Sequence, residues 1–462
     1  MKYAVLLDFG STYTKVACVD LDGQEVVLTD KFPSTVHSDA MINLRECFDA
    51  ACRVMSETEF DEALKLSTSS AAGGLRIAVS GLTRSLSIEA GRNASFGAGG
   101  KIMHIASGLM TDDDIRAIEE SGAEIVLLCG GYENGNTRLV LHNGELLSRS
   151  RIKIPVIYAG NSAVARDIRH MFISRGKECF TAENIIPDVG MLNIGPTVDI
   201  IRDLFMHRIT DMKGVGGVKS ELDGDIIPTP ASVLAAGELL YRGTDRSEGI
   251  GPYMMADIGG ATTDIYSFNE NISYDGAKKA GSPEPAAKRT VEGDMGMRES
   301  SICLVVERGR EKFAGECGIT PEELDEAITL RTGHHEYIAD SEIQKRIDHN
   351  IACSAVGISA RRHAGRVVKT LSKGCRLVQY GKNLSEVQKV IGTGGIIVNN
   401  RDTAAEVLRS VELKESERDD VLLPDSVETL IDEDYIFYAA GLLRDYDEEA
   451  ALAIMKKSIK SI

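Results

Sequence analysis

Short apolar runs, separated by turn residues, predict that the chain begins with β-strands. The predicted strands are residues 3–7, 15–20 and 24–29, and the Asp-Gly pair at 22–23 is a typical hairpin turn. Apolar positions in the next stretch, 41–55, recur at helical spacing. Three strands followed by a helix are therefore expected at the start of the chain.

From residue 75 onward, strand-like and helix-like segments alternate. Strands are predicted at "LRIAVSGL", "GKIMHIASGL", "AEIVLLCGG" and "IPVIYAGN". Helices are predicted at "TRSLSIEAGRNASFG" and at "TDDDIRAIEESG", where Thr111 is the expected N-cap. Alternation of this kind indicates parallel strand pairing and an α/β unit.

The rest of the pattern is mainly helical. The stretch "TPASVLAAGELLYRG" is rich in small residues and is expected to pack closely on a neighbouring element. The polar stretch 275–290 is either a surface loop or an excursion between strands. Further helices are predicted near 321–331, 340–372 and 402–410, and again before the C-terminus.

Composition and charge exclude some classes of partner. The 462 residues are 43% hydrophobic and 26% charged, with a net charge of −18, so a broad basic face for nucleic acid or anionic lipid is not expected. The N-terminus reaches Asp8 after five apolar residues, which are too few for the apolar core of a signal peptide, so no signal peptide is expected. The sequence contains no uncharged apolar run of 18 residues, so a membrane span is not expected either. None of the nine cysteines forms a CxxC pair, and a reduced cytoplasmic protein is expected.

One motif occurs twice and carries the candidate chemistry. "DFGSTYTK" (8–15) and "DIGGATTD" (257–264) both follow apolar residues, with Gly at the third place and Thr at the seventh. Glycine lets a ligand approach the backbone, and the turn offers N–H groups and hydroxyls to anionic oxygens. The aspartate cannot hold phosphate, but it can hold a hydrated divalent cation or orient a water molecule. Lys15 supplies a compensating positive charge.

Two such hairpins facing one another would hold a nucleoside polyphosphate from opposite sides. The alternative is that both are ordinary tight hairpin turns; a single copy would favour that alternative, whereas the pair favours the nucleotide. A third Gly-rich turn, "KVIGTGGIIVNN" (389–400), follows an apolar strand. Its glycines, Gly392, Gly394 and Gly395, permit close contact with a base or a ribose.

These three motifs, in this order, resemble those of the actin, Hsp70 and hexokinase superfamily. The resemblance implies an α/β protein with an actin-like ATPase (ribonuclease H-like) duplicated two-lobe fold. "PTPASVLAAGELL" and "YIFYAAGLL" resemble its two connecting helices. The expected domains are a first lobe at 1–250, with an α/β insertion at about 33–150, and a second lobe at 251–462 whose C-terminal helix returns toward the first.

Within this superfamily the chain resembles the glutamate mutase accessory proteins, the MutL or GlmL family, over nearly its whole length. "AEIVLLCGGYENGN", "PVIYAGN" and "VEGDMGMR" carry this narrower resemblance. The family accompanies adenosylcobalamin-dependent mutases of amino-acid fermentation. The resemblance implies an ATP-dependent, chaperone-like reactivating factor whose partners are mutase subunits, of glutamate mutase or an aminomutase. It leaves the oligomeric state open.

The resemblance also assigns roles to residues. Asp8 and Asp257 would be the catalytic carboxylates and would bind Mg²⁺, partly through water. The residues expected to contact ATP are Gly10, Ser11, Thr12, Lys15, Gly259, Gly260, Thr262 and Thr263 at the phosphates, and Gly394 and Gly395 at the adenosine.

One position departs from the chaperone pattern. Chaperone relatives carry a glutamate just before the small-residue helix, placed to polarise the attacking water; here that position is Pro228, and the nearest upstream acid is Asp225. Loss of one positioned base commonly lowers a rate by about 10²–10⁴. The expected activity is therefore a slow Mg²⁺-dependent ATPase, or one that depends on a partner.

Several other residues have two interpretations. Glu292 and Asp294 are candidates for the ribose or the metal, and equally for a solvated loop. His334, His335 and Glu336 suggest a metal site but lack a third ligand at suitable spacing, which favours a surface helix end. Arg84 and Arg92 are candidates for a cofactor or partner contact, but an ordinary helix surface is favoured.

Three other functions remain compatible with these motifs. A small-molecule kinase shares the fold and the phosphate turns, with Asp257 or Asp225 as its candidate base, but the chain has no sugar-binding signature. A filament-forming ATPase has no specific feature in its favour. A nucleotide-binding protein without turnover is the third.

Overall fold

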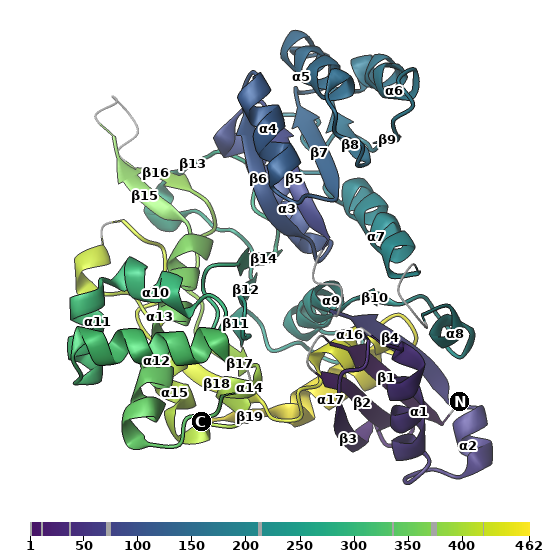
Figure 1. The fold of residues 1–462 in the computed structure, drawn as a ribbon, viewed down its shortest axis with the longest axis vertical. Helices are drawn as coiled ribbons and strands as arrows, with labels where there is room; N and C mark the ends of the chain where they lie inside the picture. The colour runs from purple at the N-terminus through teal and green to yellow at the C-terminus, as the bar shows by residue number, and fades with distance from the viewer. Residues whose placement is uncertain are drawn as a thin grey trace. The chain divides into compact units, whose positions relative to one another are not determined.

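The structure is a computed structural model that describes residues 2–10, 13–36, 38–70, 75–210, 215–334, 337–370, 377–418 and 420–462, with the backbone alone at 206–210, 215 and 216. It divides into two units, whose elements are labelled in Figure 1. Unit 1 comprises Met1–Ala236, Gly281–Pro285 and Phe437–Ile454. Unit 2 comprises Gly237–Ala280, Ala286–Ile436 and Met455–Ile462. The chain passes between the units five times, and two of these crossings lie within helices, α9 (Thr229–Arg242) and α17 (Glu448–Ser458).

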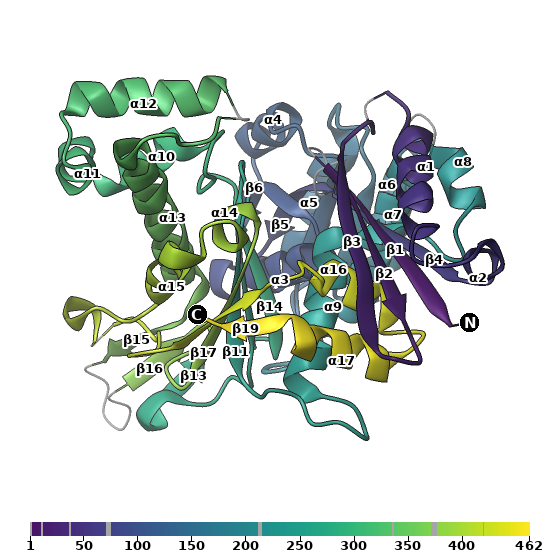
Figure 2. The same cartoon turned by 90° about the horizontal axis from the view of Figure 1, so that it is seen from below.

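A five-stranded mixed sheet contains the N-terminal strands of unit 1. The strands β1 (Tyr3–Phe9), β2 (Tyr13–Asp20) and β3 (Glu25–Pro33) form an antiparallel meander. The strand β4 (Leu64–Ser69) is parallel to β1, and β10 (Ile227–Pro228) is parallel to β4. The order is β10-β4-β1-β2-β3, and Figure 2 shows β3, β2, β1 and β4 side by side. The three strands predicted at the start of the chain are confirmed.

Unit 2 repeats this arrangement strand for strand. Its meander is β11 (Tyr253–Ile258), β12 (Thr263–Phe268) and β14 (Ala287–Glu292). The strand β17 (Lys389–Thr393) is parallel to β11, and β18 (Glu428–Asp432) is parallel to β17. A sixth strand, β19 (Ile459–Ser461), pairs antiparallel with β18. The repeat is the duplicated ribonuclease H-like topology of actin-like ATPases, and the predicted fold class is confirmed.

A second sheet in unit 1 is wholly parallel and forms an insertion between β4 and β10. Its order is β6-β5-β7-β8-β9, and its strands are β5 (Arg76–Gly81), β6 (Lys101–Ser107), β7 (Ile125–Gly130), β8 (Val156–Gly160) and β9 (Cys179–Thr181). The predicted strand and helix alternation is confirmed, including Thr111 as N-cap of α4 (Asp112–Glu120). Strands β7 and β8 are buried along their whole length, as is usual for a parallel sheet covered on both faces.

The strand order of the insertion reverses direction between β5 and β7, the point at which such sheets commonly bind ligands. Here two close contacts of the protein's own residues lie near the ends of these strands. Gly130 has a φ of 144°, and a Cβ on it would lie 2.5 Å from Cγ of Leu82. The backbone N–H of Ser282, in the segment Gly281–Pro285, donates to the carbonyl oxygen of Ser85 at 2.6 Å.

The insertion has different boundaries from those expected. Its strands span residues 76–181, whereas the sequence suggested about 33–150. The difference arises because β4 pairs with β1 rather than with β5, so β4 is a strand of the first sheet. The helix α1 (Ala40–Ala51), which precedes β4, therefore also lies outside the insertion. A helix that leads to a parallel strand has the same sequence pattern in either sheet.

The remaining elements surround these sheets. One predicted helix, 340–372, is shorter than expected and ends at His363, because the chain then forms a strand. The stretch 275–290 is an excursion between strands, since it contains β13 (Lys278–Ala280), which pairs with β16 (Leu377–Tyr380). In unit 1 the other described helices are α2 (Glu57–Asp61), a π-helical turn (Arg84–Ile88), α3 (Glu89–Gly97), α5 (Arg138–Arg149), a 3-10 turn (Ser162–Val164), α6 (Ala165–Ile173), α7 (Gly195–Thr210), α8 (Val215–Ser220) and α16 (Phe437–Leu443). In unit 2 the other described elements are a 3-10 turn (Tyr274–Gly276), β13 (Lys278–Ala280), α10 (Ser301–Arg308), α11 (Arg310–Cys317), α12 (Pro321–Gly333), α13 (Glu342–His363), β15 (Arg366–Lys369), β16 (Leu377–Tyr380), α14 (Gly395–Val398), α15 (Arg401–Arg409) and a second 3-10 turn (Glu415–Glu417).

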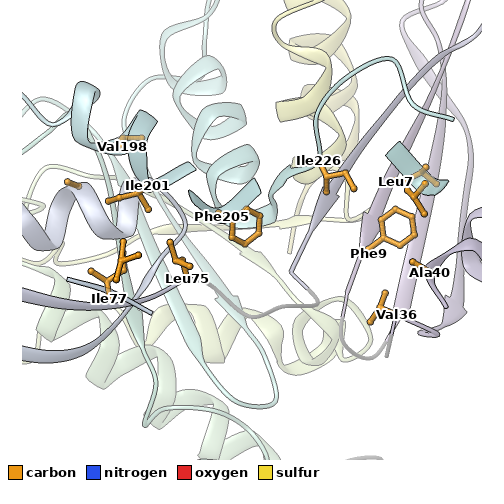
Figure 3. Packing of buried hydrophobic residues seen from close by; sticks show 14 of the residues in the cluster. Leu7, Phe9, Val36, Ala40, Leu75, Ile77, Val198, Ile201, Phe205 and Ile226 are labelled. Atoms are coloured by element: carbon orange, nitrogen blue, oxygen red, sulfur yellow. The ribbon is translucent and has the colours of Figure 1, made fainter. Parts of the chain in front are cut away.

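One continuous hydrophobic core joins the two sheets of unit 1. Figure 3 shows Val198, Ile201 and Phe205 of α7 beside Leu75 and Ile77 at the start of the insertion, and the same cluster continues to β1 and α1. The other face of the insertion has a separate core that includes Val126, Leu128 and Tyr158. The insertion is therefore anchored to the first sheet through one face and has a core of its own on the other.

Two further features concern the helices and the cysteines. Among the described residues, none of the helices combines the length and the apolar character that crossing a membrane requires. The eight cysteines in the described part of the chain are all unpaired thiols, six of them not exposed. Burial raises the pKa of the Cys18 thiol to about 12, which keeps that thiol protonated.

Candidate functional site

Asp8 lies at the end of β1 and is almost completely buried, with 1% of its surface exposed. Its Oδ2 accepts a hydrogen bond from Nζ of Lys15 at 3.2 Å. Its Oδ1 accepts hydrogen bonds from the hydroxyls of Thr68 at 3.0 Å and Thr229 at 2.6 Å. A buried charge is tolerated only when it is paired and hydrogen-bonded, and these donors meet that requirement. Both oxygens of Asp8 are therefore engaged by donors of the protein itself.

The strand register explains why these residues meet. Asp8 is directly opposite Lys15 in the β1–β2 hairpin and directly beside Thr68 in the parallel β1–β4 pair. Thr229 is the first residue of α9, which follows β10 without a break. Sequence analysis identified Asp8 and Lys15 but missed the two threonines. The available signal was a hydroxyl residue within the apolar strand "LKLSTS" and another immediately before Pro230.

The turn after Asp8 needs a glycine for its own closure. The N–H of Gly10 donates to the carbonyl oxygen of Tyr13 at 3.1 Å, and a Cβ on Gly10 would lie 2.5 Å from that oxygen. The hydroxyl of Ser34 donates to the carbonyl oxygen of Gly10 at 2.6 Å. Two residues predicted to contact phosphate, Ser11 and Thr12, lie outside the described residues.

The position at which chaperone relatives carry glutamate has no acid in this structure. Pro228 ends β10, and the next side chain is that of Thr229, which is bonded to Asp8. Asp225, the nearest upstream acid, is exposed and forms an ion pair with Lys219 at 2.8 Å. Asp225 is therefore part of the surface near α8 rather than a buried base.

The helices α9 and α16 pack against each other along their backbones within unit 1. A Cβ on Gly441 of α16 would lie 2.0 Å from the carbonyl oxygen of Ser232 of α9. The hydroxyl of Ser232 donates to the carbonyl oxygen of Tyr438 at 2.7 Å, and the Tyr438 hydroxyl donates to that of Leu6 in β1 at 3.4 Å. The close packing predicted for the small-residue helix is confirmed, and it fixes the helix that carries Thr229.

Asp257 is the counterpart of Asp8 in unit 2. It lies one residue before the end of β11, is partly exposed, and is beside Asp264 of β12 and Thr393 of β17. The third Gly-rich turn follows β17 directly. Gly394 has a φ of 93°, and a Cβ on it would lie 2.9 Å from Oδ1 of Asp257. The second and third predicted motifs therefore meet at the carboxylate of Asp257.

The turn after Asp257 (residues 259–262) directs its carbonyl groups toward one backing segment, residues 297–300. The carbonyl oxygen of Gly259 accepts from the N–H of Met297 at 3.0 Å. That of Gly260 accepts from the N–H groups of Arg298 and Glu299 at 2.8 and 3.0 Å. That of Ala261 accepts from the hydroxyl of Ser300 at 2.6 Å. With its carbonyls fixed on one side, the turn can present N–H groups on the other side, as anion-binding turns do.

Two glycines of these motifs are not required by the protein's own packing. Gly260 is exposed, does not have a positive φ, and a Cβ on it would lie 3.9 Å from its nearest contact, Cβ of Arg298. Gly395 is also exposed, and its added Cβ would lie 3.7 Å from its nearest contact, Nδ2 of Asn399. Gly259 is tighter, with a Cβ placed 3.2 Å from the carbonyl oxygen of Thr262. Open space at Gly260 and Gly395 suits a ligand that approaches the backbone.

The three residues after Ala261 have different surroundings. Thr262 is partly exposed, and its hydroxyl donates to Oδ2 of Asp264 at 3.4 Å. Thr263 is fully buried, and its hydroxyl donates to the carbonyl oxygen of Met295 at 2.5 Å, so it holds the turn rather than offering a hydroxyl to a ligand. Asp264 is held by the buried guanidinium of Arg289, with Nε 2.7 Å from Oδ1.

The remaining candidates lie on the surface of their units. Glu292 and Asp294 both form ion pairs with Arg362, at 2.8 and 2.9 Å. Arg92 forms a weak pair with Glu89 at 3.8 Å, and Arg84 is exposed on its π-helical turn. His334 is the C-cap of α12, and its predicted partners His335 and Glu336 lie outside the described residues.

Comparison with known proteins identifies the family. The family model of the MutL protein matches residues 4–459. The protein MutL of Clostridium tetanomorphum is 34% identical over 460 residues, which cover 99% of each chain. This chain belongs to the MutL family.

Solved structures give weaker similarity. The activator of 2-hydroxyisocaproyl-CoA dehydratase from Clostridium difficile, with bound ADPNP, is 12% identical, with a TM-score of 0.30, and the match covers 100% of this chain and 99% of that one. The ethanolamine utilization protein EutJ from Carboxydothermus hydrogenoformans is also 12% identical, with a TM-score of 0.30 and coverage of 97% and 89%. Similarity this low does not identify a function.

Asp8 and Asp257 are the carboxylates that begin the two predicted phosphate motifs of this MutL chain. Within the described ranges, no group of three or more His, Cys, Asp and Glu side chains is arranged to hold a metal. Mg²⁺ is usually bound through one or two carboxylates, several waters and the phosphates of a substrate, and it does not need such a cage. Asp8, with its fixed carboxylate, and Asp257, beside the open glycines, are the side chains suited to that mode.

Proposed function

We propose that this chain binds Mg-ATP and hydrolyses it slowly, and that the turns after Asp8 and Asp257 are its two phosphate-binding motifs. The observation that carries the proposal is the equivalence of the two aspartates. Each lies at the end of the first strand of a repeated sheet and is followed two positions later by a turn glycine. The open positions at Gly260 and Gly395 support a ligand at the second of these turns.

The roles of the residues follow from their chemistry. Asp8 would orient waters of a hydrated Mg²⁺, and Asp257 would serve as the second carboxylate, for the metal or the attacking water. Lys15, which is partly exposed and bonded to Asp8, would offset phosphate charge. Phosphate contacts would come from Gly10, Ser11, Thr12, Gly259, Gly260 and Thr262, and adenosine contacts from Gly394 and Gly395. Thr263 is proposed as a support of the turn because its hydroxyl is bonded to Met295.

The cellular role is proposed to be that of a cytoplasmic, chaperone-like reactivating factor for an adenosylcobalamin-dependent mutase, such as glutamate mutase. Support comes from membership of the MutL family over residues 4–459. The absence of an acid at Pro228 supports slow turnover, which suits a factor whose cycle is governed by a partner. The insertion at 76–181 is the proposed partner-facing part, since none of the nucleotide motifs lies within it.

The nucleotide half of the proposal is tested by calorimetry. The unaltered protein is titrated with ATP in the presence and absence of Mg²⁺, beside Asp8→Asn and Asp257→Asn. Both variants are expected to lose most of the Mg²⁺-dependent gain in affinity. Asp20→Asn is the matched control, because Asp20 lies at the other end of the β1–β2 hairpin and accepts a hydrogen bond from the N–H of Gly23 in the adjoining turn. Unchanged affinity in both site variants would refute the site.

The mutase half needs a separate assay. Glutamate mutase inactivated by a damaged cofactor is incubated with this protein, ATP, Mg²⁺ and fresh adenosylcobalamin, and recovery of mutase activity is followed. Recovery is expected with the unaltered protein and not with Asp8→Asn. A screen of hydroxyl acceptors is run in parallel. If a phosphorylated metabolite forms and mutase activity does not recover, the proposed function as a reactivating factor is wrong and that of a small-molecule kinase takes its place.

A further inference from the structure

Arg298 occupies a central position behind the turn at residues 259–262. Its backbone N–H donates to the carbonyl oxygen of Gly260 at 2.8 Å, so it is part of the backing segment itself. A Cβ on the nearby Gly296 would lie 2.3 Å from the carbonyl carbon of Ala261, which leaves no room between this segment and the turn. A shift of Arg298 would therefore move the turn as well.

The side chain of Arg298 leads away from the turn to a shared carboxylate. Its Nη1 and Nη2 are 3.1 and 3.0 Å from the two oxygens of Asp348, in a bidentate pair. Oδ1 of Asp348 also accepts from Nε of Arg331 at 2.7 Å. Arg331 is fully buried, and its other nitrogens donate to Ala327 of α12 and to Gln344 of α13. One carboxylate thus joins the backing segment to both helices.

The long helix α13 is attached to the same region at its C-terminal end. Arg362 forms ion pairs with Glu292 and Asp294, which lie five and three positions before the backing segment. The buried ring of His363 is 2.8 Å from the hydroxyls of Ser267 in β12 and Thr290 in β14. The "VEGDMGMR" stretch (291–298) is therefore held to α13 by ion pairs with Arg362 near the start of the stretch and with Asp348 at its end.

We propose that Arg298 is a positioning residue, which through Asp348 and Arg331 couples the turn after Asp257 to helices α12 and α13. A ligand on the turn and the packing of these helices then stabilise one another. This inference rests on the proposed function for the identity of the ligand, Mg-ATP. It adds a role for Arg298, Asp348 and Arg331, side chains that would not touch the nucleotide.

The chain offers a matched pair for comparison. Arg361 and Glu417 form a second bidentate pair in unit 2, with both distances 2.8 Å and with similarly low exposure. Arg361 of α13 also donates to the carbonyl oxygens of Ser410 and Glu412. In the part of the chain that the structure describes, neither residue of this pair is hydrogen-bonded to the turn at residues 259–262. Loss of either arginine removes a comparable interaction from the fold, but only Arg298 backs the turn.

The experiment compares Arg298→Gln, Arg298→Lys and Arg361→Gln with the unaltered full chain. Three quantities are measured: the denaturant midpoint, the affinity for Mg-ATP by calorimetry, and amide hydrogen exchange in peptides from 257–264 and from α12 and α13. Arg298→Gln and Arg361→Gln are expected to lower the midpoint alike. Only Arg298→Gln is expected to weaken Mg-ATP binding, by about tenfold, as commonly follows loss of a support behind a binding group. Arg298→Lys should recover part of that loss.

Hydrogen exchange tests the coupling directly. In the unaltered chain and in Arg361→Gln, Mg-ATP is expected to slow exchange in both the turn and α12–α13. In Arg298→Gln, slowing in α12–α13 should disappear, and the ligand-free turn should exchange faster. Mg-ATP binding by the unaltered chain, with equal affinity and equal exchange in the two glutamine variants, would overturn this inference and leave the proposed function standing. Failure of the unaltered chain to bind Mg-ATP would overturn both.

Discussion

Lys15 lies directly opposite Asp8 across the β1–β2 hairpin, and its Nζ is 3.2 Å from Oδ2 of Asp8. The pair is asymmetric, because the carboxylate is buried whereas the lysine side chain remains 26% exposed. The lysine can therefore hold the carboxylate in place and still present positive charge toward solvent or a ligand.

Replacement of that lysine should affect both stability and binding. Lys15→Met leaves Asp8 buried with two donors instead of three, and we expect the free energy of unfolding to fall by about 1–3 kcal/mol. Mg-ATP affinity should fall with it. Urea denaturation and calorimetry measure the two effects. Lys31→Met is the control, since Lys31 is opposite Lys15 on β3 but exposed, and its change should stay within about 0.5 kcal/mol. Equal effects of the two substitutions would contradict the assigned role.

The glycine at 260 should matter for the ligand and not for the fold. Gly260→Ala places a methyl group in open space at an ordinary backbone conformation, so the free energy of unfolding should change by less than about 0.5 kcal/mol. Mg-ATP affinity should nevertheless fall, because the methyl group occupies space through which the phosphates approach. Calorimetry and urea denaturation check the two halves. A variant with unaltered affinity would show that Gly260 does not face the nucleotide.

Gly394→Ala should disturb Asp257. The substitution adds a Cβ at a φ of 93° and within 2.9 Å of Oδ1 of Asp257, so both strain and a displaced carboxylate are expected. Gly251→Ala separates the two causes, because Gly251 also has a positive φ, 74°, but open space around it. Both variants should lose stability, and only Gly394→Ala should lose Mg²⁺-dependent ATP binding. Equal binding by the two variants would argue against contact between these motifs.

Packing of α9 against α16 should not tolerate a single methyl group. Gly441→Ala would place Cβ 2.0 Å from the carbonyl oxygen of Ser232, and a loss of about 1–3 kcal/mol or more is expected. Gly315→Ala is the opposite case, since Gly315 lies within α11 with no neighbour near its Cβ. It should be neutral or stabilise the protein by up to about 1 kcal/mol. Thermal and urea denaturation of the two variants check this contrast.

Acid should weaken unit 2 through His363. Burial, with Lys288 and Lys382 nearby, lowers the pKa of His363 well below its ordinary value, so the folded protein keeps the ring neutral. Below about pH 6.5 the unfolded chain binds a proton that the folded chain does not, and stability falls by up to about 1.4 kcal/mol per pH unit. Above about pH 6.5 the neutral His363 ring makes its full contribution to the free energy of unfolding. His363→Gln should lack this component when unfolding is measured from pH 7.5 to 5, whereas the exposed His170→Gln should retain it.

The sequence predicted the two hairpin turns because the strand end, the aspartate and the glycine that mark each turn all lie within eight residues. Asp8, Lys15 and Gly10 are therefore found without a structure. Thr68 and Thr229 were missed, because they lie 60 and 221 positions from Asp8 and only strand pairing brings them together. Thr263 was expected to contact phosphate, and its hydrogen bond to the carbonyl oxygen of Met295 could not be foreseen, because Met295 belongs to another segment. The start of the insertion was misplaced because the pairing of β4 with β1 has no local signal.

The place at which the insertion enters the first sheet has a mechanical consequence. Its chain leaves that sheet just after Thr68 and rejoins it just before Thr229, and the hydroxyls of both threonines hold the same oxygen of Asp8. A movement of the 76–181 sheet relative to the first sheet would therefore act on Asp8 through both of its hydroxyl donors. A protein bound to the 76–181 sheet would thus be linked to one carboxylate of the first sheet at two positions of the chain, Thr68 and Thr229.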